Sequence, residues 1–123
     1  MKTQSNFFKS FGWIKAERGR HAEDYFEELI RSSLDAGKLP SWFYALHRTE
    51  QNAKADRLGI DFIVHTDRGR ININVKSSNT SVKIFARKHP GSSTIVVVVD
   101  PMRDRDIQLG SIITVIGGAY RAL

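Results

Sequence analysis

One stretch of the chain, residues 60–77, constrains the fold more than any other. Residues 60–65 are rich in β-branched and apolar side chains, which is typical of a strand. In residues 71–76 apolar and polar side chains alternate strictly, as they do in a strand with one apolar and one polar face. Between them, residues 67–70 read Asp-Arg-Gly-Arg, a turn whose glycine can adopt a positive φ. The stretch therefore predicts a β-hairpin.

The other predicted elements lie on both sides of this hairpin in the sequence. They are, in chain order, a helix over residues 16–36, a strand over 42–47, a loop over 49–58, a short basic helix over 81–88, a strand over 94–99 and a last helix over 104–116. The strand over 94–99 is almost continuously β-branched, which is typical of a strand buried on both faces. Helices around a mixed sheet predict an α/β domain.

The length of 123 residues predicts one domain, over residues 15–123. Residues 1–14 form a separate aromatic segment that could serve as an interface. No apolar run approaches the ~18 residues of a membrane span, and the N-terminus does not resemble a secretory signal. The sequence has no cysteine, which excludes disulfides, thiolate metal sites and a cysteine nucleophile, and which fits a cytoplasmic location.

The formal net charge is +6. An excess of positive charge attracts polyanions, of which nucleic acid is the commonest; a surface that merely keeps the protein in solution is the alternative. Three cations, Lys83, Arg87 and Lys88, gather in the predicted helix over 81–88. They form either a solvated face or a set of contacts to DNA phosphates.

Asp61 and Lys76 are the residues whose placement points to chemistry. An aspartate near one strand and a lysine on the polar side of its hairpin partner can converge across the sheet. A carboxylate there can hold Mg²⁺, and a lysine beside it can orient a water or stabilise the charge that develops in phosphodiester hydrolysis. An acid next to Phe62 is costly to bury without a partner, so we expect Asp61 to have either a function or an ion partner.

The sequence resembles the PD-(D/E)XK nuclease superfamily over residues 19–99. Residues 19–23, Gly-Arg-His-Ala-Glu, are similar to the family's Gly-x-x-Ala-Glu helix signature. Residues 59–61, Gly-Ile-Asp, are similar to its strand aspartate after a glycine, and residues 74–76, Asn-Val-Lys, to its acid-any-lysine pattern. The resemblance implies a restriction-endonuclease-like fold, with a mixed four-stranded sheet flanked by helices.

The resemblance also implies a metal-dependent DNA endonuclease that hydrolyses phosphodiester bonds with Mg²⁺ or Mn²⁺. Asp61 would be the principal metal ligand, Glu23 and Asn74 would be auxiliary ligands, and Lys76 would position the attacking water. The implied substrate is duplex or branched DNA. A homodimer is expected, because cutting two strands needs two sites, and residues 1–14 could supply its interface.

Asn74 departs from the family pattern, which has an acid or often a glutamine at this position. Its carbonyl can still ligate a metal, but it carries no charge, and Mg²⁺ prefers anionic oxygen. Three outcomes stay open. The site works with Asp61, Glu23 and the Asn74 oxygen; a displaced acid, Asp56 or Glu50, substitutes; or the protein is a catalytically silent DNA-binding or assembly protein on the same scaffold.

A third class of function is a basic α/β protein unrelated to nucleases, in which Asp61 and Lys76 form a structural ion pair. Glu23 would then be one solvated acid in an acidic helical run.

Overall fold

The computed structural model describes residues 20–50 and 53–123. Segment 1–14, expected to be an interface, lies outside the described residues. The elements are a helix at residues 20–35, β1 (Phe43–Arg48), α2 (Lys54–Arg57), β2 (Phe62–Thr66), β3 (Gly69–Lys76), α3 (Asn79–Lys88), β4 (Ile95–Val98) and α4 (Arg105–Arg121). None of the helices in the described residues is long and apolar enough to cross a membrane.

The four strands form one mixed sheet in the order β1-β2-β3-β4. β2 is antiparallel to both β1 and β3, and its pairing with β3 from Phe62↔Ile73 to Thr66↔Gly69 is the predicted hairpin. β4 runs parallel to β3, and α3 makes the crossover that a parallel pair requires. The predicted fold class, α/β with a mixed four-stranded sheet flanked by helices, is confirmed.

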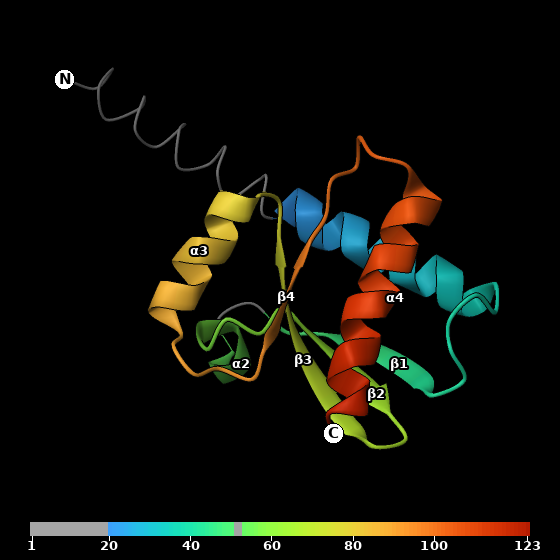
Figure 1. The fold of residues 1–123 in the computed structure, drawn as a ribbon, viewed down its shortest axis with the longest axis horizontal. Helices are drawn as coiled ribbons and strands as arrows, with labels where there is room; N and C mark the ends of the chain where they lie inside the picture. The colour runs from blue at the N-terminus through green and yellow to red at the C-terminus, as the bar shows by residue number, and fades with distance from the viewer. Residues whose placement is uncertain (1–19, 51–52) are drawn as a thin grey trace.

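The core lies on the face of the sheet that Phe62 and Ile73 share. The Phe62 ring packs on the Phe26 ring of the 20–35 helix, with centroids 4.9 Å apart. In Figure 1 this helix and α4 lie to the right of β3 and β4, and α2 and α3 lie to the left. The largest fully buried side chains are Phe26, Leu29, Ile30, Phe62, Val64, Ile73, Val99 and Ile116.

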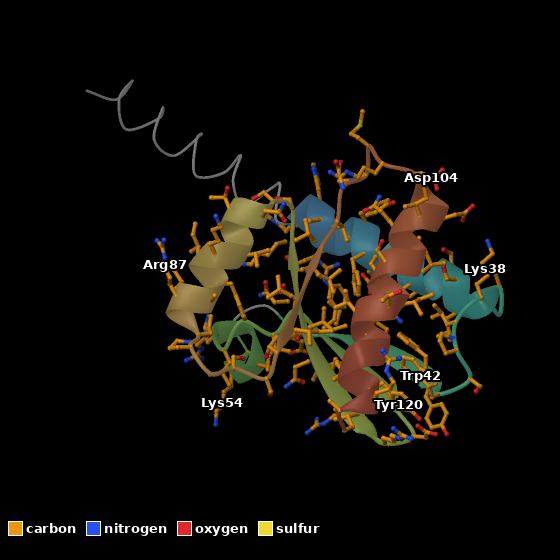
Figure 2. The ribbon with its side chains drawn as sticks, in the orientation of Figure 1. Lys38, Trp42, Lys54, Arg87, Asp104 and Tyr120 are labelled. Atoms are coloured by element: carbon orange, nitrogen blue, oxygen red, sulfur yellow. The ribbon has the colours of Figure 1, made fainter. Side chains whose placement is uncertain are left out.

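Two segments differ from the predicted secondary structure. α2 forms within residues 49–58, which were expected to be a loop. α4 continues past residue 116 to Arg121 in spite of two consecutive glycines. Its end is held by Tyr120, whose ring stacks on Trp42 with centroids 4.2 Å apart and planes within 6° (Figure 2). This tertiary contact offsets the low helix propensity of glycine.

β4 corrects the prediction that residues 94–99 are buried on both faces. Val97 and Val99 are buried against the core, but Val98, on the opposite face, is 40% exposed. Among the described strands β4 pairs with β3 alone, so it is an outer strand. Its β-branched composition reflects strand propensity and not burial on two sides.

Candidate active site

Asp61 lies where β2 begins, and its main chain is bonded to both neighbouring strands. Its N–H donates to the Ile73 carbonyl at 2.8 Å, and its carbonyl accepts from the Thr49 N–H at 2.9 Å. The carboxylate then accepts a hydrogen bond from the Val75 N–H, with Oδ2 2.8 Å from the nitrogen. Asp61 is therefore fixed against β3 at the residue between Asn74 and Lys76.

Asn74 was predicted on the polar face of its strand, but this face is covered at Asn74. The side chain is only 3% exposed. Its Nδ2 donates to the Gly59 carbonyl at 2.6 Å, which ties β3 to the turn that precedes Asp61. Its Oδ1 is buried and accepts no hydrogen bond from any residue that the structure describes. A buried acceptor without a donor is unusual and points to a water or a cation as its partner.

Thr49 is a candidate that the sequence did not suggest. Its N–H bonds to Asp61, and its Oγ1 is the other buried side-chain atom without a hydrogen-bond partner in the described part of the chain. The pairings Arg48↔Phe62 and Phe62↔Ile73 continue by one residue to align Thr49, Asp61 and Asn74 across three strands. Two unpartnered oxygens thus belong to residues on either side of Asp61. A threonine in a polar segment gives no sequence signal for this role.

Gly59 and α3 close the site on one side. Gly59 has φ +80°, and a Cβ at this position would meet Phe85 Cε2 at 2.5 Å and His89 Nε2 at 3.1 Å. The backbone of the turn therefore lies directly under α3, at a distance that a larger residue could not keep. The Asn74 amide binds the carbonyl of this same glycine.

Lys76 is half-buried at the end of β3 and lies against the same helix. Its Nζ is 5.6 Å from the centre of the Phe85 ring, within the range of a cation–π contact. The strand places Asn74 and Lys76 on the same face, one on each side of the residue that binds Asp61. Asp61, Asn74 and Lys76 are thus brought together at one end of β3.

Glu23 lies on the neighbouring 20–35 helix, near Arg48. Burial lowers the pKa of Arg48, but hydrogen bonds to Asp24 and Glu27 and the nearby charges of Asp24 and Glu23 raise the pKa above its usual value. Arg48 Nη1 is 2.7 Å from Asp24 Oδ1 and 3.0 Å from Glu27 Oε1. The charge of Glu23 is therefore partly balanced by Arg48, on the β1 side of the 20–35 helix.

Lys83, Arg87 and Lys88 are exposed on α3. Figure 2 shows Arg87 pointing outward from α3, and Lys54 pointing outward from α2 on the same side of the molecule. The turn at Gly59 connects α2 to Asp61 and packs under α3, so these cations surround the candidate site without lining it.

The oxygens at the site fit a metal ion only if the substrate completes its ligands. In residues 20–50 and 53–123 no three histidine, cysteine, aspartate or glutamate side chains gather closely enough to hold a metal ion. Mg²⁺ in phosphoryl-transfer sites is commonly held by one or two carboxylates together with waters and substrate phosphates. The oxygens that the chain could offer such a site are the Asp61 carboxylate and Asn74 Oδ1, which has no hydrogen-bond partner among the described residues.

Comparison with known proteins adds no further assignment: no family model, curated protein or solved structure matches this chain.

Proposed function

We propose that this protein is a metal-dependent DNA endonuclease of the PD-(D/E)XK type. The observation that carries the proposal is the hydrogen bond from the Val75 N–H to Asp61, which fixes a carboxylate between Asn74 and Lys76. Among the described residues the two buried side-chain oxygens without hydrogen-bond partners belong to Thr49, whose N–H binds the Asp61 carbonyl, and to Asn74, which precedes the residue that binds the Asp61 carboxylate. Polar atoms left unsatisfied in a native structure are concentrated at functional sites, which supports a site here.

Asp61 and Asn74 would hold Mg²⁺ or Mn²⁺ there, with Glu23 as a further carboxylate. The ion would supply charge stabilisation for the phosphate under attack and a more acidic bound water. The chain itself would contribute by holding the Asp61 carboxylate in a fixed position. Three hydrogen bonds hold Asp61, so its carboxylate needs little reorganisation when the negative charge develops.

Lys76 would donate to the attacking water or to the phosphate oxygen that gains charge. Lys76 directly follows the residue whose N–H binds the Asp61 carboxylate, and its ammonium makes a cation–π contact with the Phe85 ring. A cation that acts mainly on developing charge lowers the barrier without greatly changing substrate affinity. Lys76 is therefore assigned to the chemical step, and the exposed cations of α2 and α3 to DNA binding.

The test is a cleavage assay on supercoiled, linear and branched DNA with Mg²⁺ and with Mn²⁺. The wild type is expected to cut, and Asp61→Asn and Lys76→Ala are each expected to lower the rate by about a hundredfold or more while DNA binding persists. A wild type that binds DNA but cuts none of these substrates with either ion would overturn the nuclease proposal.

A second candidate, a DNA-binding protein without cleavage, is favoured by one observation. The Asn74 amide is engaged with the Gly59 carbonyl, as expected of a residue with a structural task. In that case the buried oxygens would hold waters, and the cations on α3 would carry the whole function. The same assay separates the two candidates, because only the first requires Asp61 and Lys76 for product formation.

A further inference from the structure

The outer edge of β4 is an unpaired strand with a groove beside it. Val99 N–H donates to the Lys76 carbonyl at 2.9 Å, so the backbone groups of Ile95, Val97 and Val99 face β3. By strand alternation the N–H and C=O groups of Val96 and Val98 face outward. Among the described strands none pairs with them.

A groove of about 430 Å³ runs between this edge and α4. Its lining includes Val96 and Val98 from the strand, and Ile107, Ser111 and Val115 from one stripe of α4. Ile107 is 72% exposed and Val115 is 45% exposed, which is unusual for large apolar side chains on one stripe. The charged residues in the lining are Asp100 and Arg103, which pair with each other at 3.6 Å.

We propose that this surface, the β4 edge with the α4 stripe, binds a second copy of the chain. A twofold axis at Val97 would place Val96 of one copy opposite Val98 of the other in an antiparallel pair. Both residues point their backbone groups outward, so each of the two pairs would exchange both N–H···O bonds. The edge is therefore complementary to itself.

The side chains and charges support the same occupant. Val96 and Val98 project from one face, so the dimer would form a continuous row of four valines across the new strand pair and would cover the exposed Val98. The stripe of Ile107 and Val115 would meet its counterpart across the axis. Because Asp100 and Arg103 neutralise each other within one copy, the surface brings no net charge against itself despite the basic chain.

The proposed interface does not depend on the proposed catalysis, but it would determine how the two candidate sites of a dimer are arranged. Lys76 is the register partner of Val98, so each candidate site would lie beside the interface. A twofold axis perpendicular to the joined sheet keeps both sites on one face. Two strands of a duplex could then be reached from the same side.

The association is measured without DNA, by sedimentation equilibrium of the full chain from micromolar to millimolar concentration. The wild type is expected to be a dimer that high salt does not dissociate, because the contact is apolar. Val98→Lys and Ile107→Lys should each weaken dimerisation by roughly tenfold or more. Met102→Lys is the matched control, since Met102 is 91% exposed and lies outside the groove lining.

Amide hydrogen exchange tests the register. In the dimer the Val96 and Val98 amides should be protected, and in Val98→Lys the Val96 amide should exchange rapidly while the Val97 amide, which faces β3, stays slow. A wild type that stays monomeric at millimolar concentration overturns the proposal. So does a dimer that Met102→Lys weakens as much as Val98→Lys, or a dimer with rapidly exchanging Val96 and Val98 amides. Loss of cleavage activity alone would leave the interface standing, so the two proposals fail separately.

Discussion

The carboxylate of Asp61 takes the place of a backbone acceptor for the Val75 N–H, just before the first residue of β2 and beside the last residues of β3. The same side chain therefore has a structural and a proposed catalytic task. Substitutions that keep or remove its acceptor oxygen separate these tasks.

Asp61→Asn and Asp61→Ala should differ in stability but not in activity. Asparagine keeps an acceptor for Val75, so the free energy of unfolding should change little, whereas alanine leaves that N–H without a partner at a cost of about 1–3 kcal/mol. Both variants lack the carboxylate and should fail to cleave DNA. Urea denaturation and the cleavage assay give the two readouts. Equal destabilisation by both changes would show that the hydrogen bond to Val75 contributes nothing measurable.

Gly59→Ala should be more damaging than its backbone conformation alone accounts for. The new Cβ would meet the Phe85 ring at 2.5 Å as well as adopt φ +80°. Gly37→Ala is the matched control, because Gly37 has φ +69° and nothing lies within 4 Å of its would-be Cβ. We expect a loss of about 1 kcal/mol in the control and about 2 kcal/mol or more at Gly59. Thermal denaturation of both variants measures the difference.

Acid should weaken the contact between the 20–35 helix and β1. Partial burial raises the pKa of Glu27, but hydrogen bonds from Arg31 and Arg48 outweigh it and hold the pKa below its usual value of 4.5. A carboxyl with a lowered pKa in the folded state stabilises the fold above its unfolded-state pKa, and this stabilisation is lost as the pH falls through the lowered value.

Glu27→Gln should therefore reduce stability near neutral pH and have a smaller effect at pH values well below 4.5. Chemical denaturation of wild type and variant across that range measures the difference in the free energy of unfolding. A difference that does not shrink as the pH falls would contradict the assignment.

DNA binding should depend steeply on salt, because contacts to phosphates release counterions. Arg87→Ala and Lys88→Ala should each weaken binding to all sequences and flatten the dependence of log K on log salt by about one unit. Lys38→Ala is the control, since Figure 2 shows Lys38 on the opposite side of the molecule from Arg87. Fluorescence anisotropy at several salt concentrations gives the slopes. If Lys38→Ala weakened binding as much as Arg87→Ala, the DNA would not contact α3 specifically, and the attraction would follow from the net charge or from another surface.

Asn74→Asp tests whether the site accepts a metal ion. The aspartate is of nearly the same size, but it sets a carboxylate oxygen against the Gly59 carbonyl, which should destabilise the metal-free protein. Mg²⁺ or Mn²⁺ should then raise the melting temperature of the variant more than that of the wild type, because binding to the folded state stabilises it. The same rise in both proteins, or in neither, would argue against a metal at Asn74.

The sheet could be predicted from local pattern because each signal is contained within a few residues. The alternation over residues 71–76 and the Asp-Arg-Gly-Arg turn fix the hairpin without reference to the rest of the chain. The outer position of β4 could not be predicted, because a run of valines has the same sequence whether one or two strands flank it. The length of α4 depends on the stack of Tyr120 on Trp42, a contact between residues far apart in the chain.

The candidate site divides in the same way. The placement of Asp61 beside the end of β3, where it binds the residue before Lys76, follows from the predicted hairpin. The hydrogen bond of Asn74 to Gly59 depends on how the turn before β2 packs on β3, and the position of Thr49 beside Asp61 depends on the pairing of β1 with β2. Neither packing relationship has a recognisable pattern in the local sequence.

The strand order in space repeats the strand order in the sequence, and this has a kinetic consequence. The β2–β3 hairpin closes a tight turn and should form within about 1–10 μs, so it can act as the template on which β1 pairs. β4 is expected to pair later, because a parallel strand can join β3 only after the α3 crossover has formed. The packing of α3 on Gly59 should therefore coincide with the slowest step of folding, and the surroundings of Asp61 would be the last part of the molecule to form.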